Sequence, residues 1–179
     1  MLLFEQLFAR GFMVFDPAKQ AGVFNREMIA EFPASRKEKI EEFRWLIGNW
    51  DATNRVRATP STPAYTDIYQ YTYNFCDDDT RICIQGPGGK ERPHLTFDPF
   101  SARWMMTFID NVYGVLQSEG WVGDVIVFTG HLTMLGVDCE MRQTITRQGH
   151  DAFHALNEER LSDGRWVVVD DFDFRRKQI

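Results

Sequence analysis

The spacing of apolar residues along the chain changes at Gly48. Before it, Ile40, Phe43 and Ile47 recur at the interval that places side chains on one face of a helix. Ser35 begins a capping-box pattern, and a glycine such as Gly48 is the residue that most often ends a helix. The pattern therefore predicts a helix from Ser35 to Ile47.

After Gly48, apolar and polar residues alternate, which is the period of a β-strand. Segments rich in Gly, Pro and Asp interrupt the alternation at short intervals and predict turns. Ten strands are expected, over residues 49–58, 65–76, 81–85, 94–98, 103–110, 113–119, 125–131, 138–147, 151–160 and 165–176. The connections are too short for helical crossovers, so the strands must run as an antiparallel meander. An open sheet of this length would expose two edges, which favours a mainly β, closed up-and-down barrel. A two-sheet sandwich is the alternative.

Residues 1–34 have a different character, with apolar clusters separated by glycine and proline. We expect a helical or irregular extension that packs on the barrel or on a second subunit, ahead of a barrel domain over residues 35–179. A disordered tail is disfavoured because six phenylalanines are too much apolar surface to leave in water. They are Phe4, Phe8, Phe12, Phe15, Phe24 and Phe32. A homodimer formed through residues 1–34 is one consequence to consider.

Composition limits the partners. The 179 residues carry a net charge of −6, so the chain offers no basic surface for nucleic acid or for an anionic membrane. Glu5 and Arg10 interrupt the first apolar segment, which does not match a secretory signal peptide. We therefore expect a cytoplasmic protein that neither binds nor crosses a membrane.

The three cysteines are Cys76, Cys83 and Cys139. In a tight hairpin between the strands over 65–76 and 81–85, Cys76 faces Arg81. Cys83 then faces Asn74, so the two thiols are diagonal rather than opposite, a poor geometry for a bridge. Free thiols and a reducing compartment are expected.

A short helix followed by Gly48-Asn49-Trp50 at the first strand resembles the Gly-x-Trp signature of lipocalins. Their calycin relatives include the fatty-acid-binding proteins and the nitrobindins. The resemblance implies that Trp50 plugs the closed end of the barrel. It also implies that a basic residue of the last strand, Arg175 or Arg176, packs over the indole.

A closer resemblance covers roughly residues 43–177. It is to a bacterial lipocalin-like domain family whose members largely lack an assigned activity. The matching segments are Leu46-Ile47-Gly48-Asn49-Trp50, Phe97-Asp98-Pro99, Phe108-Ile109-Asp110, Glu119-Gly120, Asp163-Gly164-Arg165-Trp166 and Phe174-Arg175-Arg176-Lys177. Residues 1–34 have no counterpart in this family.

Two strands carry apolar and aromatic stripes that either fill the barrel or line a cavity in it. A barrel of about ten strands is too wide for side chains to fill entirely, so a ligand-sized space is expected. The predicted ligand-binding residues are Tyr69, Tyr71, Tyr73, Trp104, Met106, Phe108, Asp110 and Gln143. Their few polar groups would orient a mostly apolar guest.

The histidines do not indicate a metal or a cofactor. His150 and His154 are expected in or beside a strand, where four residues span about 13 Å, too far to share one zinc ion. Nitrobindins hold haem through a histidine close to the last strand, and residues 166–177 contain none. His94 and His131 are expected to be partly exposed strand residues. We therefore predict no metal site and no cofactor.

Three functions follow from this pattern. The first is binding of a small hydrophobic or aromatic molecule in the barrel. The second is an isomerase, lyase or decarboxylase in the same cavity, with Asp110 as general base and Tyr71 or Tyr73 as acid or oxyanion donor. The third is a homodimeric interaction scaffold. Architecture does not choose among them.

Overall fold

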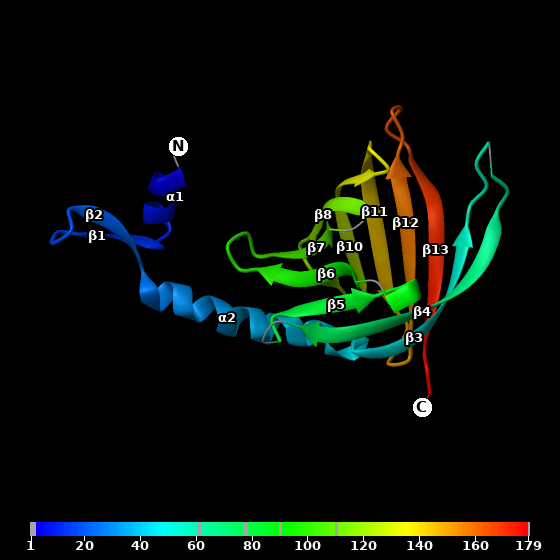
Figure 1. Cartoon of the computed structure of the whole chain (residues 1–179), viewed down its shortest axis with the longest axis horizontal. Helices are drawn as coiled ribbons and strands as arrows, with labels where there is room; N and C mark the ends of the chain where they lie inside the picture. Colours follow the sequence, from blue (N-terminus) through cyan, green and yellow to red (C-terminus); the bar gives the residue numbers. More distant parts are fainter. Residues whose placement is uncertain (1–2, 61, 77–78, 90, 110, 179) are drawn as a thin grey trace.

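The computed structural model describes residues 3–60, 62–76, 79–89, 91–109 and 111–178, and ten of its strands form a closed antiparallel ring (Figure 1). The ring strands are β3 (Gly48–Val56), β4 (Tyr65–Cys76), β5 (Arg81–Gln85), β6 (Glu91–Asp98), β7 (Arg103–Ile109), β8 (Val112–Ser118), β10 (Val125–Met134), β11 (Val137–Arg147), β12 (Ala152–Arg160) and β13 (Trp166–Arg176). Each strand pairs with the next in the chain, and β13 pairs with β3 to close the ring. The predicted closed barrel is confirmed, and a two-sheet sandwich is excluded.

The strand expected over 125–131 is longer in the structure, because β10 continues to Met134. Leu135 and Gly136, both at positive φ, form the two-residue connection between Met134 and Val137, the geometry that suits the twist of a hairpin. A short strand that the sequence pattern did not predict, β9 (Trp121–Val122), pairs with the start of β10.

One end of the barrel is closed by a 3-10 helix, η1 (Glu41–Leu46), which leads into β3. The Trp50 side chain is fully buried there and donates its indole Nε1 to the carbonyl oxygen of Leu46, 2.7 Å away. Arg176, rather than Arg175, lies over the indole, with its guanidinium 4.3 Å from the ring centre. Gly48 leaves room for that guanidinium, because a Cβ at this position would lie 2.8 Å from Arg176 Nη1.

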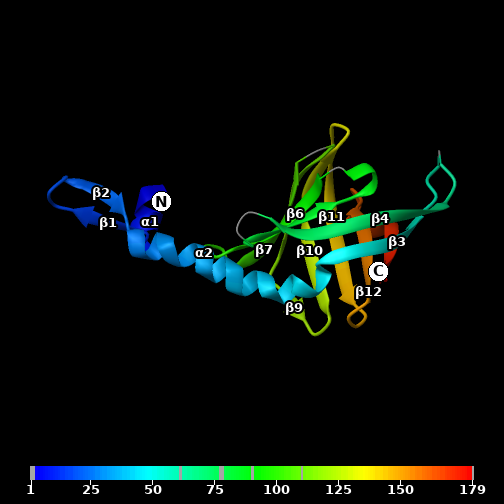
Figure 2. The same ribbon diagram turned by 60° about the horizontal axis from the view of Figure 1, so that its bottom comes forward.

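The N-terminal part contains α1 (Leu3–Ala9), a hairpin of β1 (Met13–Asp16) and β2 (Ala21–Phe24), and the long helix α2 (Arg26–Ile40). In Figures 1 and 2, α2 runs from under the barrel to this hairpin, which lies to one side. The Phe12 ring nevertheless meets the Phe100 ring of the β6–β7 turn at 4.5 Å, and Arg10 donates to the Phe100 carbonyl.

The predicted helix start at Ser35 is wrong. Helix α2 begins at Arg26 and ends at Ile40, so Ser35 lies inside it. An interior proline such as Pro33 removes one backbone hydrogen bond, and fifteen residues supply enough others to continue the helix. The helix also gives way to η1 before Gly48, which is the first residue of β3. The expected boundary between residues 34 and 35 therefore falls within α2.

The prediction of free thiols at Cys76 and Cys83 is also wrong, because these residues form a disulfide. Their register is the expected one, with Cys76 opposite Arg81 and Cys83 opposite Asn74. Strand twist, however, draws one diagonal of a hairpin together, and the two Cα atoms are 5.9 Å apart, within bridging range. Cys139 is free and buried. The cysteines therefore no longer support a reducing compartment, and the cytoplasmic location stays a prediction.

Within the described residues, no helix combines the length and the apolar character needed to span a bilayer.

Candidate functional site

The barrel encloses a cavity of about 330 Å³. It begins above Leu46 and Phe153 near the closed end. At the other end it reaches Asn111, Val112 and Met134, where β7 and β10 end and β8 begins. A barrel of ten strands has an interior wider than facing side chains can fill, which is the physical reason for the space. Its volume lies within the range of small-molecule sites.

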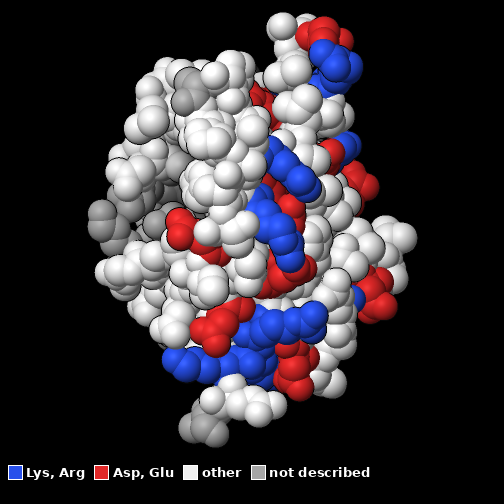
Figure 3. Space-filling model, turned by 90° about the vertical axis from the view of Figure 1, so that its right-hand side faces the viewer, with Lys and Arg blue, Asp and Glu red and all other residues white. Residues whose placement is uncertain are grey.

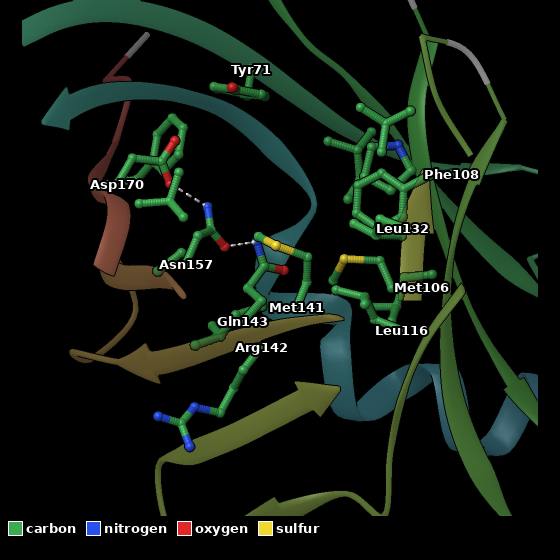
Figure 4. A pocket seen from close by; sticks show the side chains of 18 of the residues that line it. Tyr71, Met106, Phe108, Leu116, Leu132, Met141, Arg142, Gln143, Asn157 and Asp170 are labelled. Atoms are coloured by element: carbon green, nitrogen blue, oxygen red, sulfur yellow. Dashed lines mark hydrogen bonds between the residues drawn. The ribbon is translucent and has the colours of Figure 1, made fainter. Parts of the chain in front are cut away.

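One wall of the cavity is apolar. It is built by β7, β8 and β10, whose inward side chains include Met106, Phe108, Leu116 and Leu132, with Met141 beside them from β11 (Figure 4). Unbranched methionines adapt to the shape of a guest, so this wall suits an apolar body without fixing its outline.

The opposite wall carries a row of three polar side chains from adjacent strands (Figure 4). Gln143 on β11 is directly opposite Asn157 on β12, which is directly opposite Asp170 on β13. Gln143 Nε2 donates to Asn157 Oδ1 at 2.9 Å, and Asn157 Nδ2 donates to Asp170 Oδ1 at 2.7 Å. This polar row offers the cavity hydrogen-bonding groups at a defined place.

Asp170 is the acidic group of the row. Burial raises the pKa of its carboxyl above the ordinary value, while hydrogen bonds from Asn157 and Asn54 act to lower it. The neighbouring Asp171 adds a smaller upward effect. Asn54, on β3, is only 5% exposed, so this carboxyl sits among amides with little water.

Arg142 also borders the cavity, but its charge points away from it (Figure 4). The guanidinium binds both carboxylate oxygens of Glu158, at 2.7 and 2.8 Å, and lies 4.5 Å from the centre of the Trp166 ring. The side chain of Arg142 therefore offers no charge to the cavity.

The structure brings together five of the predicted ligand-binding residues. Lining the cavity are Tyr71, Tyr73, Met106, Phe108 and Gln143. Burial raises the pKa of the Tyr73 hydroxyl, which keeps it protonated and able to donate.

Two predicted residues lie elsewhere. Tyr69 is nearer the β3–β4 hairpin, where its hydroxyl donates to Asp67. Trp104 packs on Phe43 and Phe97 with ring centres 4.6 and 5.3 Å apart, as part of the packed core below the cavity. Asp110 lies outside the described residues, so its role as a general base stays a prediction.

Sequence reasoning missed Asn157 and Asp170. The alternation did contain them, since Phe153, Ala155 and Asn157 share the inner face of β12. Counting back by two from Phe174 through Phe172 in the last strand also places Asp170 inside. The signal was hidden because Asp170 is followed by Asp171, and an acidic pair is more typical of a solvated surface.

The histidines lie apart from the cavity. His154 projects from the outer side of the barrel with Nε2 3.6 Å from an Asp171 oxygen, and His131 is exposed beside Asp138. His94 pairs with Cys83 on the β5–β6 ladder, and His150 precedes β12. Across the described ranges, no three His, Cys, Asp or Glu side chains converge as metal ligands do.

The outer surface has charge of both signs. On the face shown in Figure 3, acidic and basic side chains lie next to one another rather than in a patch of one sign. Where β13 meets β3, Asp171 binds Arg55 and Arg57, and Asp173 binds Arg55. In these ion pairs the opposite charges on the outer face of β13 and β3, the two strands that close the ring, balance one another.

No protein-family model matches this sequence, and no curated protein matches it. Among solved structures, the barrel is similar to the one titled "Crystal Structure of Rv2717c from M. tuberculosis". The TM-score is 0.52 at 10% identity, and the alignment covers 78% of this chain and 97% of that one. At this identity the similarity shows a shared barrel fold, and the lipocalin-like family assignment stays a prediction.

Proposed function

We propose that this protein binds a small, mostly apolar molecule inside the barrel. The observation that supports this most directly is the cavity of about 330 Å³, with an apolar wall facing a row of three polar side chains. Such a combination holds an apolar body by burial and orients it by a few hydrogen bonds.

The mouth of the barrel supports the proposal. Large apolar side chains are exposed at the ends of β7, β8, β10 and β11, in the connections opposite the closed end. They are Ile109, Tyr113, Leu135 and Val137. Leu135, in the two-residue turn between β10 and β11, is 96% exposed. An apolar rim would lower the cost of passing an apolar guest from water into the cavity.

The test is titration of the full chain with N-phenyl-1-naphthylamine, a neutral dye whose emission rises in an apolar site. Ala155 is buried and borders the cavity, so Ala155→Leu fills part of the space. We expect binding to weaken about tenfold, equivalent to about 1.4 kcal/mol. Ala64→Leu, in the exposed segment before β4, is the matched control and should bind as the unaltered chain does. Equal affinity in both variants contradicts the proposal.

A second function, homodimerisation through residues 1–34, is supported by the surface of the N-terminal part. Several large apolar side chains there stay exposed in the isolated chain, and such a patch is typical of an interaction surface. They are Leu3, Phe4, Phe8, Val14, Phe15 and Phe24. A dimer would bury them without involving the cavity, so the two functions are compatible.

A further inference from the structure

The hydrogen bonds of the polar row have a direction. An ionised carboxylate only accepts, so Asn157 turns its amide nitrogen toward Asp170. The Asn157 oxygen is then the acceptor for Gln143 Nε2, which leaves the Gln143 carbonyl oxygen at the end of the row. One N–H of each amide is used along the row, and the Asp170 carboxylate oxygens and the Gln143 carbonyl oxygen are the acceptors at its two ends.

Another polar side chain, that of Asn54, lies behind the row. Asn54 hydrogen-bonds to Asp170, and its own Oδ1 is buried with no partner among the described residues. The Asp170 carboxylate is therefore the charged acceptor of the cavity wall. A guest that supplies a donor would complete its hydrogen bonds.

The charge of the cavity wall is negative. Arg142 is the one Lys, Arg or His in the described lining, and Glu158 and Trp166 hold its guanidinium outside. Asp170 is consequently a partly buried carboxyl for which the described residues supply no cationic partner. A buried carboxylate of this kind costs free energy until a positive charge comes to it, and a second carboxylate beside it would add repulsion.

We propose that the cavity takes an amphiphilic amine, with its ammonium group at Asp170 and its apolar body against Met106, Leu116 and Leu132. This inference rests on the proposed small-molecule function and adds the class of ligand. It excludes fatty acids as the preferred guests, because the Asp170 carboxylate would repel theirs. The overall charge of −6 also favours the approach of a cation.

The experiment compares three probes with the same ten-carbon chain: decylamine, decanol and decanoate. Each is titrated by calorimetry into the full chain at pH 7.5. We expect decylamine to bind at least about tenfold more tightly than decanoate, with decanol between them. Asp170→Asn should reduce that preference to about twofold or less. Asp173→Asn, on the same strand but in an ion pair with Arg55 outside the barrel, should keep it.

Decanoate binding as tightly as decylamine would overturn the amine assignment while leaving small-molecule binding in place. A preference that survives Asp170→Asn, or that Asp173→Asn removes equally, would overturn the role given to Asp170. If neither the naphthylamine dye nor any ten-carbon probe binds, the proposed function fails and this inference with it. The comparison of the three probes uses the unaltered chain, so it remains decisive if Asp170→Asn does not fold.

Discussion

The Arg176 guanidinium covers the Trp50 indole at 4.3 Å, and the two residues are partners in the register that joins the last strand to the first. The same guanidinium donates to the carbonyl oxygen of Ile47 at 2.8 Å and to that of Trp45. Its Nε also meets Asp151 at 3.1 Å. One side chain thus ties η1, β3 and the loop before β12 together at the closed end of the barrel.

Replacing Arg176 by alanine should destabilise the fold by about 2–3 kcal/mol, because buried carbonyls lose a charged donor and the indole loses its cation. Urea unfolding followed by tryptophan fluorescence measures the change. Arg175→Ala is the control, since this neighbour is exposed, and should stay within about 0.5 kcal/mol. Similar small effects for both variants would mean that Arg176 does not hold the closed end.

Asp170→Asn should stabilise the empty protein at pH 7.5. Burial raises the pKa of Asp170, so the folded state holds the proton more tightly than the unfolded state does. The ionised carboxyl therefore costs stability at every pH above its folded pKa, and the amide removes that cost. We expect a gain of about 1 kcal/mol, or about 2–4 °C in Tm.

The gain should shrink as the pH falls toward the ordinary aspartate pKa of about 3.9, where both states are protonated. Calorimetric scans of the two proteins across this range test the sign. A variant less stable than the unaltered chain at pH 7.5 would show that the hydrogen bonds from Asn157 and Asn54 outweigh the cost of burial. If Asp170→Asn does stabilise the protein, the natural chain keeps the Asp170 carboxyl at the expense of folding stability, as is often true of binding groups.

The Cys76–Cys83 bridge should contribute about 2 kcal/mol, as expected for a loop closed over a sequence separation of seven. Dithiothreitol should lower the urea midpoint of the unaltered chain accordingly. The double variant Cys76→Ser with Cys83→Ser should be insensitive to the reductant. An identical midpoint with and without reductant in the unaltered chain would refute the bridge.

Replacing Phe4 and Phe15 together by serine should abolish the proposed dimer, because these side chains are 61% and 63% exposed on the N-terminal part. Light scattering after gel filtration of the full chain measures the mass. Ile68→Ser, which changes an equally exposed apolar residue on β4, should leave the mass unchanged. An unaltered chain that is monomeric at all concentrations tested would refute dimerisation through this surface.

Most of the barrel could be predicted from local patterns. Strand alternation and turn residues are local properties, so ten strands and their antiparallel order followed directly from them, and the closed ring followed from the cost of free edges. Residues of α2 show where this fails. Ser35 and Pro33 carry signals for a helix boundary, yet the helix continues through both.

The site was predicted only in part, for a related reason. Alternation tells which side of a strand a residue is on, but not how far along the barrel it lies. Trp104 and Met106 share one inner face, yet Trp104 packs into the core at the closed end while Met106 borders the cavity two residues later. Depth along the barrel depends on strand tilt and register around the whole ring, which no single strand encodes.

The sequence by itself determined the ten strands of the ring, their inward faces and the place of Trp50, because each depends on residues close together in the chain. Tertiary structure alone decided that Cys76 bridges Cys83, and that Gln143, Asn157 and Asp170 align as one polar row. These features depend on twist and on contacts between strands, so only the closed sheet could set them. The polar row is among them, and with it the character of the guest that the barrel is proposed to hold.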